Sequence, residues 1–278
     1  MPELPEVETI VRDIRPLITG RTLTHPKLYH THVLRRVTKT RLLRVLAGNR
    51  IEAVDRRAKH IVLCLKSGER LVIQPRMTGS LVVHPSHLTP DERRYAVLQI
   101  GLEGNGQLIF RDVRRLGTIW LLDEEGWQAY TQHIGPEPLE ADFGSKQFAR
   151  RLSNSRQAIK KVLMDQRRLA GVGNIYANEA LFRARLDPSR PANRLSQTEY
   201  QSLYRTVRAV LREAIREKGT TVRDYRTGTG ESGSYQQILR VYGRGGEPCL
   251  RCRTLLATTH AIDGRATTFC WRCQGVQE

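Results

Sequence analysis

Apolar positions near the start of the chain recur at the spacing of a helix with one buried face. They are Val7, Ile10, Val11, Ile14 and Leu17. Pro5, Glu6 and Glu8 occupy the first turn, where a proline fits and where the helix dipole favours carboxylates. The pattern predicts a helix over residues 5–18, preceded by a short extended arm over residues 2–4.

Between about residues 28 and 122 the pattern changes to short runs of β-forming residues separated by turn signals. The runs are Ile61–Leu65, Leu71–Ile73, Leu81–Val83, Ala96–Leu102, Leu108–Phe110 and Thr118–Leu122. Strands at this spacing predict an antiparallel sandwich or barrel. No apolar run is longer than residues 61–65, so we expect no membrane span.

The sequence Gly135-Pro136-Glu137-Pro138 forms a stiff break in the chain. We therefore expect a β-sandwich domain over residues 2–132, a linker over 133–148 and a second domain over 149–278. Helical patterns dominate from about 145 to 217, and a Gly-, Ser- and Thr-rich stretch over 220–234 predicts a mobile loop. The expected fold class is α+β.

Charge restricts the class of partner. The chain has 46 Lys and Arg against 28 Asp and Glu, a net charge of +18 that favours a polyanion. Residues 151–278 carry 23 basic and 11 acidic side chains, so we expect most phosphate contacts there. Charge alone also fits a ribosomal protein or a membrane-surface binder. The N-terminus is acidic, without a secretory signal, and we expect a soluble, cytoplasmic protein.

Four of the five cysteines form two closely spaced pairs near the C-terminus. Cys249 and Cys252 are followed, after seventeen residues, by Cys270 and Cys273. This spacing is typical of a four-cysteine Zn²⁺ site; two disulfides or free thiols are the alternatives. Four sulfur ligands leave no position for an activated water, so the metal is expected to be structural. Cys64 lies in an apolar strand, where we expect a core residue.

The chain begins Met1-Pro2-Glu3, and removal of Met1 leaves a secondary amine at its end. An α-amino group is on the order of 10% unprotonated at pH 7, against roughly 0.04% for a lysine. Pro2 is therefore a candidate nucleophile toward an electrophilic sugar carbon, with Glu3 beside it as general acid or base. The alternative is a frayed chain end.

Five blocks of motifs follow one another along the whole chain. They are MPELPEVET (1–9), RRAK (56–59), RMTG (76–79) with DVRRLG (112–117), LAGVGNIYANE (169–179), and residues 241–274 with the four cysteines. In this order they resemble the formamidopyrimidine-DNA glycosylases. The resemblance implies a sandwich with an N-terminal helix, then a helical domain with a helix-two-turn-helix motif and a zinc finger over 244–278.

The resemblance also implies roles for individual residues. Pro2 would attack C1′ of a damaged nucleotide in double-stranded DNA, Glu3 would act on the sugar ring oxygen and Lys59 would contact the adjacent phosphate. The base would be flipped out of the duplex before it is reached. The expected gap-filling residues are Met77 and Arg114 with the wedge Leu116. The expected phosphate contacts are Lys160, Asn174, Tyr242 and Arg265, and Arg265 is counted with Pro2, Glu3 and Lys59 as a catalytic residue. From the residues alone, Arg265 fits a phosphate or base contact and a solvated charge equally well.

The implied activity is excision of 8-oxoguanine and formamidopyrimidines, followed by β,δ-elimination, by a monomer with one Zn²⁺. No nucleotide cofactor is expected, because no strand precedes Gly171-Val172-Gly173. Two positions depart from the family pattern: Leu116 replaces a phenylalanine wedge, and Gln74 replaces a histidine. Three alternatives stay open at this point, namely an endonuclease VIII-like enzyme for oxidised pyrimidines, a non-catalytic zinc-finger DNA-binding protein and an N-terminal proline tautomerase.

Overall fold

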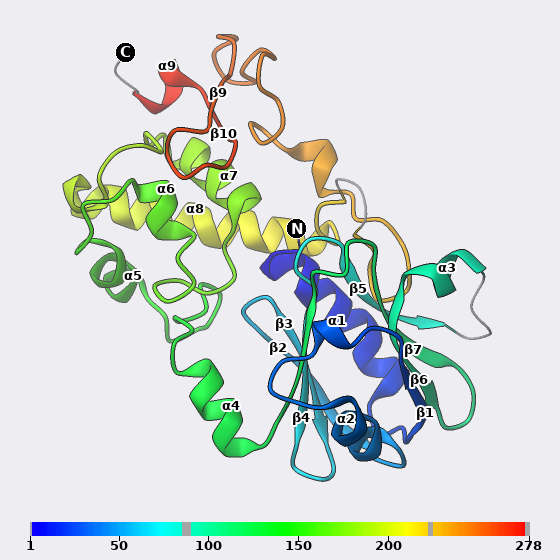
Figure 1. Ribbon diagram of the computed structural model, residues 1–278. Helices are drawn as coiled ribbons and strands as arrows, with labels where there is room; N and C mark the ends of the chain where they lie inside the picture. Colours follow the sequence, from blue (N-terminus) through cyan, green and yellow to red (C-terminus); the bar gives the residue numbers. More distant parts are fainter. Residues whose placement is uncertain (1, 85–89, 222–224, 276–278) are drawn as a thin grey trace. The chain divides into compact units, whose positions relative to one another are not determined.

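The computed structural model describes residues 2–84, 90–221 and 225–275. They divide into two compact units, Met1–Gln132 with Ile215–Gln236, and His133–Ala214 with Gln237–Glu278 (Figure 1). Residues 215–236 thus belong with the first unit, although we expected them in the second domain. Local sequence patterns give no sign of this return of the chain, because it depends on packing against distant residues.

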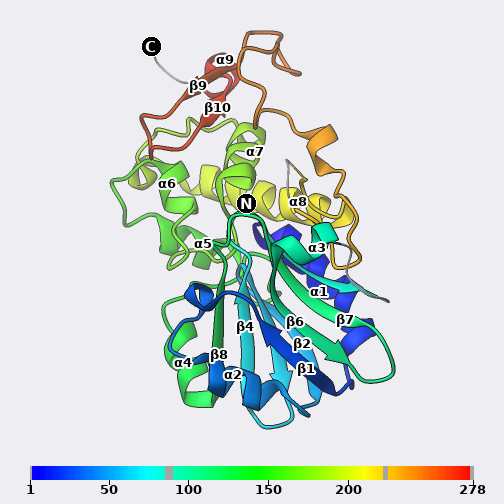
Figure 2. The same cartoon turned by 45° about the vertical axis from the view of Figure 1, so that its right-hand side comes forward.

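The first unit is built on two four-stranded antiparallel sheets, seen as two layers of strands (Figure 1 and Figure 2). The first has the order β1-β6-β7-β5 and the second β2-β3-β4-β8. The strands are β1 Leu23–Leu28, β2 Ile51–Arg57, β3 His60–Leu65, β4 Arg70–Gln74, β5 Gly79–His84, β6 Ala96–Leu102, β7 Gln107–Asp112 and β8 Thr118–Leu122. One apolar core joins both sheets, and the predicted sandwich is confirmed.

Two strands, β1 and β2, were absent from the expected set. β1 contains Pro26, and its pairing with β6 shifts register between Thr24 and Lys27. It lies at the edge of its sheet, where a proline is tolerated. β2 is also an edge strand, and charged residues occupy most of its second half. Neither strand therefore has a continuous apolar run.

The helix α1, Leu4–Ile18, confirms the first predicted element and packs against β2 and β5. Val7, Ile10 and Ile14 are fully buried in the main core. Leu17 differs from expectation, since 42% of its surface is exposed while Ile18 is buried in its place. The shorter helices of this unit are α2 Lys39–Leu46, α3 Pro90–Tyr95 and α4 Glu124–Thr131.

The second unit is mainly helical. Its helices are α5 Ser145–Leu152, α6 Ile159–Leu163, α7 Asn174–Ala184, α8 Gln197–Arg216, whose last two residues count with the first unit, and α9 Trp271–Gln274. A short hairpin, β9 Ala257–Thr259 with β10 Thr267–Phe269, precedes α9. In the described part of the chain, no helix has the length and apolar character needed to cross a membrane.

Candidate functional site

The extended arm at the start of the chain is buried against its own helix. Pro2 and Glu3 are both buried, and Glu3 is the N-cap of α1. The Glu6 carboxylate binds two backbone amides: Oε2 accepts from the Glu3 N–H at 2.7 Å and Oε1 from the Thr220 N–H at 2.8 Å. The arm is therefore held in an ordered position, and the frayed end considered from the sequence is wrong.

A partly buried ion pair joins α1 to the turn that carries Lys59. Arg56 Nε donates to Glu8 Oε2 at 2.8 Å, and Arg56 Nη1 donates to the Ala58 carbonyl at 3.1 Å. Burial raises the pKa of Glu8, but the hydrogen bonds from Arg56 and Arg12 outweigh it and lower that pKa below the usual value. Lys59 lies on the β2–β3 turn and is 9% exposed. The pair thus connects the helix after Pro2 with the predicted catalytic lysine.

His60 fixes the other side of this turn. Its Nδ1 lies 3.0 Å from the Arg57 carbonyl and its Nε2 lies 2.9 Å from the Tyr130 hydroxyl. A carbonyl only accepts, so Nδ1 carries the proton and Nε2 accepts from Tyr130. Burial, with a further contribution from the Lys59 cation, lowers the pKa of His60 to about 4. A neutral imidazole therefore holds the turn at neutral pH.

Two loops present the predicted gap-filling residues. The Met77 loop, residues 75–78, joins β4 to β5, and the Arg114 loop, residues 113–117, joins β7 to β8. Met77 and Leu116 are 42% and 44% exposed, and Arg114 is exposed as well. Arg114 Nη1 lies 3.2 Å from Met77 Sδ, so these side chains from the two loops meet.

The Gly-, Ser- and Thr-rich segment contacts the first unit closely. Besides the Thr220 contact with Glu6, the Gly228 N–H donates to Asp13 Oδ2 at 3.1 Å, and the Gly228 carbonyl accepts from the Val83 N–H at 3.0 Å. Residues 222–224 of this segment lie outside the described residues. The described parts are thus attached to α1 and β5, and the segment's expected mobility stays a prediction.

Within the second unit, predicted phosphate contacts gather at one hairpin. Asn174 is the first residue of α7, directly after the Gly171-Val172-Gly173 turn as expected, and its Nδ2 donates to the Ala266 carbonyl at 3.0 Å. Lys160 is fully buried, and its Nζ donates to Asp263 Oδ1 at 3.2 Å and to Thr267 Oγ1 at 2.7 Å. Arg265 is exposed in the β9–β10 turn.

Glu179 on α7 organises the chain around Tyr242. It is completely buried and accepts hydrogen bonds from three successive backbone N–H groups. These are Arg240, Val241 and Tyr242, at 2.9 to 3.1 Å from Oε1. Tyr242 itself is partly exposed. Glu179 thus fixes the backbone that positions one of the predicted contact residues.

The four C-terminal cysteines converge as their spacing predicts. The sulfur atoms of Cys249, Cys252, Cys270 and Cys273 all lie within 4.8 Å of one another. Closest approaches of 3.4 and 4.0 Å exceed a disulfide bond and bracket the separation of about 3.8 Å that a tetrahedron with 2.3 Å Zn–S bonds requires. The donor set therefore fits a four-coordinate metal, and the disulfide alternative is wrong. His260 is exposed and does not belong to the cluster.

Cys64 is separate from this cluster and is not in the main core. It lies on the outer face of β3, partly exposed, within a small apolar group that includes Val62 and Trp120. Its Sγ lies 3.9 Å from Asp55 Oδ2. Successive side chains of a strand point to opposite faces, and this alternation places Cys64 on the outer face. Because nearly every residue of the run is apolar, the sequence does not show which face is the core.

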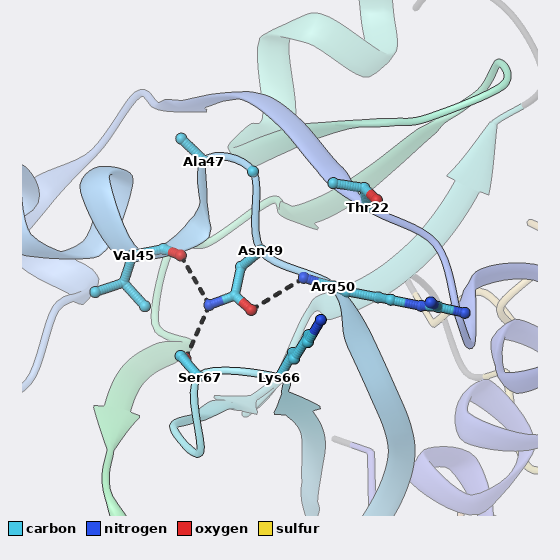
Figure 3. A pocket seen from close by; sticks show the side chains of 8 residues that line it. Thr22, Val45, Ala47, Asn49, Arg50, Lys66 and Ser67 are labelled. Carbon is cyan, nitrogen blue, oxygen red and sulfur yellow. Dashed lines mark hydrogen bonds between the residues drawn. The ribbon is translucent and has the colours of Figure 1, made fainter.

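An open hollow of about 540 Å³ lies at the end of the sandwich near α2. At its floor Asn49 Nδ2 donates to the Val45 carbonyl and to Ser67 Oγ, while its Oδ1 accepts from the Arg50 N–H (Figure 3). None of the predicted site residues lines it. The Asn49 amide here joins two chain segments, residues 45–50 and the turn at Ser67, which is a structural use.

Two family models match the chain. Residues 1–119 match the formamidopyrimidine-DNA glycosylase N-terminal domain, and residues 134–226 match the formamidopyrimidine-DNA glycosylase H2TH domain. The formamidopyrimidine-DNA glycosylase of Chloroflexus aurantiacus is 41% identical over 99% of this chain and 98% of its own, and that of Thermomicrobium roseum is 42% identical over 99% of both. The chain belongs to the formamidopyrimidine-DNA glycosylase family.

Solved structures of the family agree with this assignment. The MutM (Fpg) protein from Thermus thermophilus is 40% identical, covers 100% of both chains and has a TM-score of 0.88. Lactococcus lactis Fpg, in a complex with DNA containing an abasic site, is 32% identical over 98% of this chain and 99% of its own, with a TM-score of 0.90. The expected enzyme class, a DNA glycosylase that also acts as a lyase at abasic sites, is confirmed, and the tautomerase and the non-catalytic binder are wrong.

Several residues that organise the site were missing from the sequence-based set. They are Glu6, Glu8, Arg56, His60, Thr78, Asp112, Tyr130 and Glu179. Most of their partners are far away in the chain, such as Arg56 for Glu8 and Val241 for Glu179. One signal in the sequence could have found them, namely a charged residue on the apolar face of a predicted helix. Burying such a residue is costly without a partner, so its presence there predicts a buried hydrogen bond or ion pair. Glu179, between Asn178 and Ala180 on a buried helix, carried this signal.

Proposed function

We propose that this protein excises oxidised purines, 8-oxoguanine and formamidopyrimidines, from double-stranded DNA and then cuts the strand. The proposal is supported by family membership and by its relatives, since Lactococcus lactis Fpg forms complexes with DNA containing Fapy-dG and with DNA containing an abasic site. The net charge of +18 favours a polyanionic partner. The expected protein is a monomer that acts without a nucleotide cofactor.

In the proposed mechanism the Pro2 amine is the nucleophile, once Met1 has been removed. Its lone pair forms the bond to C1′ as the glycosidic bond breaks with its electrons on the departing base. The attacking nitrogen then loses its proton, and the base takes up a proton as it leaves. The sugar ring then opens as Glu3 delivers a proton to O4′, leaving an iminium ion at C1′. Loss of a C2′ proton expels the 3′ phosphate, and a second elimination expels the 5′ phosphate.

The observation that carries this proposal is the ordered burial of Pro2 and Glu3 at the start of α1, beside the bonds that lead to Lys59. A nucleophile must be held at a defined position to react with one carbon of a large substrate. In our proposal Lys59 contacts the phosphate next to the lesion. The Glu8–Arg56 pair would keep the lysine's turn and the Pro2 helix in register.

The remaining predicted residues have binding roles in this proposal. Met77, Arg114 and Leu116 fill the gap that the everted nucleotide leaves, with Arg114 on the orphaned cytosine. The proposed phosphate contacts are Asn174, Tyr242 and Arg265. Lys160, also expected there, is fully buried, so its ammonium would support the β9–β10 hairpin through Asp263 and Thr267. The four thiolates would hold one structural Zn²⁺, which would stabilise the β9–β10 hairpin that carries Arg265. A flipped base is required because the sugar carbon is inaccessible inside a duplex.

Borohydride trapping tests the chemistry and the substrate class together. We expect a covalent adduct with a duplex that contains 8-oxoguanine opposite cytosine, and weaker trapping on oxidised thymine. Stronger trapping on oxidised thymine would instead identify an endonuclease VIII-like specificity, and no trapping on either would overturn the proposal. Pro2→Gly should retain weak trapping, because it keeps an α-amine, whereas retained Met1 or an N-terminal tag should abolish it. Full excision by the tagged protein would place the nucleophile elsewhere.

A further inference from the structure

The Met77 loop and the Arg114 loop cross between the two sheets side by side. β4 pairs with β8 in one sheet, and β5 pairs with β7 in the other. Gly79, the first residue of β5, is opposite Asp112, the last residue of β7. Both loops therefore leave one pair of neighbouring strands and enter another pair, so their ends are fixed at the same corner of the sandwich.

The Asp112 carboxylate binds both loops at this corner. Asp112 is completely buried. Its Oδ1 accepts a hydrogen bond from the Thr78 hydroxyl at the end of the Met77 loop. Its Oδ2 accepts from the Gly117 N–H, at the end of the Arg114 loop, at 2.7 Å. A carboxylate held by two donors from two segments connects those segments directly.

The Thr78 hydroxyl extends this connection to the backbone of Arg114, one of the gap-filling residues. Because a carboxylate only accepts, Thr78 must donate to Asp112. Its oxygen in turn accepts from the Arg114 backbone N–H at 2.9 Å. Thr78 is 5% exposed, so water cannot readily replace either bond. The Thr78 hydroxyl thus connects the Met77 loop to the backbone of Arg114 as well as to the Asp112 carboxylate.

The Phe110 ring fills the space beneath the two loops. Phe110 is completely buried, and two glycines pack against it. A Cβ added to Gly79 would lie 2.9 Å from the ring and 2.5 Å from the Pro75 carbonyl oxygen, and one added to Gly117 would lie 2.5 Å from the ring. Neither loop can therefore carry a side chain there or move toward the ring without a clash.

Each loop has one residue with left-handed backbone directly beside a gap-filling side chain. Arg76, just before Met77, has φ +58°, and Arg115, just after Arg114, has φ +53°. A Cβ makes this conformation unfavourable, so it persists only where the surrounding bonds enforce it. Arg115 receives such a bond, since its N–H donates to the Asp112 carbonyl at 3.3 Å.

From this geometry we infer that Thr78 and Asp112 are positioning residues that hold the two loops as one rigid probe. The inference rests on the proposed function, in which Met77, Arg114 and Leu116 enter the duplex, and adds the residues that set their mutual position. Inserting three separate side chains into a stack would cost the ordering of each. If the two loops are already fixed relative to each other, this ordering cost has been met before they enter the base stack. Insertion into DNA would then depend on the Thr78 hydroxyl and the Asp112 carboxylate that fix the loops.

Thr78→Val removes the hydroxyl at nearly constant volume, and Thr78→Ser keeps it. The measured quantity is the single-turnover excision rate on an 8-oxoguanine duplex divided by the lyase rate on a single-stranded abasic oligonucleotide, where no stack has to be entered. We expect the ratio to fall by on the order of tenfold to a hundredfold in Thr78→Val, the scale of a 1 Å misplacement, and to remain near wild type in Thr78→Ser. Insertion, followed by 2-aminopurine fluorescence next to the lesion, should slow in parallel.

Ile100→Val is the matched control, because Ile100 is buried in the same sheet away from both loops and its truncation lowers stability without touching Thr78 or Asp112. Its ratio should stay at the wild-type value. Asp112→Asn is the second variant. Its amide would place an N–H₂ group opposite one of the two donors, the Thr78 hydroxyl or the Gly117 N–H, so that bond would be lost. Its ratio should fall as in Thr78→Val. The preference for cytosine over adenine opposite the lesion should decrease in both variants, because Arg114 is displaced.

Two results would overturn the inference while leaving the proposed function intact. One is a Thr78→Val ratio equal to that of Ile100→Val, and the other is a Thr78→Ser ratio as low as that of Thr78→Val. If wild-type protein neither excises nor is trapped on the lesion duplex, the proposed function fails, and the inference fails with it.

Discussion

The sandwich of the first unit and the cysteine-bearing segment of the second unit are stabilised in different ways. In the described residues, the sandwich has a core of 27 buried apolar side chains. They come from both sheets, α1, α2, Val33 and the returning segment, residues 215–236. The corresponding cluster around the hairpin has five, two of which are the cysteines Cys249 and Cys270. The sandwich can fold on apolar burial, whereas so small a cluster needs a metal or another cross-link.

This difference affects how each region positions polar groups. In the sandwich, polar bonds such as Glu8–Arg56 and Thr78–Asp112 are added to a fold that the core already maintains. Their loss should displace site residues more than it unfolds the unit. In the hairpin, Lys160 and Asn174 are attached to residues whose own positions depend on the cysteine cluster. Loss of the metal should therefore remove all of these contacts together.

The largest effect is expected from removing the metal. Cys270→Ser, or a strong chelator, should eliminate zinc and nearly all duplex binding, because structural Zn²⁺ supplies about 10–16 kcal/mol in small zinc domains. The sandwich should remain folded, as judged by circular dichroism and the thermal transition. Cys64→Ser is the control, since Cys64 lies outside the cluster. Tight duplex binding by the zinc-free variant would contradict the comparison.

A smaller effect is expected at Glu179, which connects α7 to the chain before the cysteine cluster. Glu179→Ala leaves three buried or partly buried N–H groups without their acceptor, and each such loss costs about 1–3 kcal/mol. With partial hydration we expect about 3 kcal/mol of lost stability, measured by denaturant unfolding. Glu247→Ala removes an exposed ion pair with Arg244 and should cost less than about 0.5 kcal/mol. Equal losses in the two variants would show that Glu179 is not a structural acceptor.

The smallest effect concerns pH and is confined to the sandwich. The pKa of His60 is about 4 in the folded protein and 6.5 when unfolded, so below pH 6.5 the unfolded state binds the extra proton. Stability is therefore lost as pH falls from 6.5 toward 4 and is unaffected by this group above that range. Between pH 7 and pH 5 wild type should lose about 2 kcal/mol more than His60→Gln in urea unfolding.

His133→Gln provides the control for this measurement, because His133 is exposed. Its loss of stability between pH 7 and pH 5 should match that of wild type. Identical losses in wild type and His60→Gln would mean that His60 is not held neutral by the turn, and the assigned direction of its bond with Tyr130 would be wrong.

Local patterns in the sequence were sufficient for elements that depend on neighbouring residues. The helix over 5–18 and the β7 and β8 strands follow from periodicity, and the cysteine cluster follows from its two closely spaced pairs. Asn174 at the start of a helix follows from the Gly-Val-Gly turn before it. These features were predictable because each is encoded within a few residues of the chain.

Features that depend on an edge or on a distant partner were not predictable in this way. β1 was not predicted because it contains Pro26, which only an edge strand tolerates. Leu17 was predicted to be buried because a periodic pattern does not show where a helix leaves the core. Cys64 was assigned to the core because an apolar strand can have one face on a minor cluster. The return of residues 215–236 to the first unit depends on contacts such as Thr220 with Glu6, 214 residues away.

The amino-acid sequence by itself determined the family, the four cysteines available to a metal and the side chains available for chemistry. The tertiary structure decided how those side chains are held: by Glu6 at the Pro2 arm, by Arg56 and His60 at the Lys59 turn, and by Glu179 at Tyr242. The physical reason is that a buried polar group needs a partner, and the fold, not proximity in the chain, selects it.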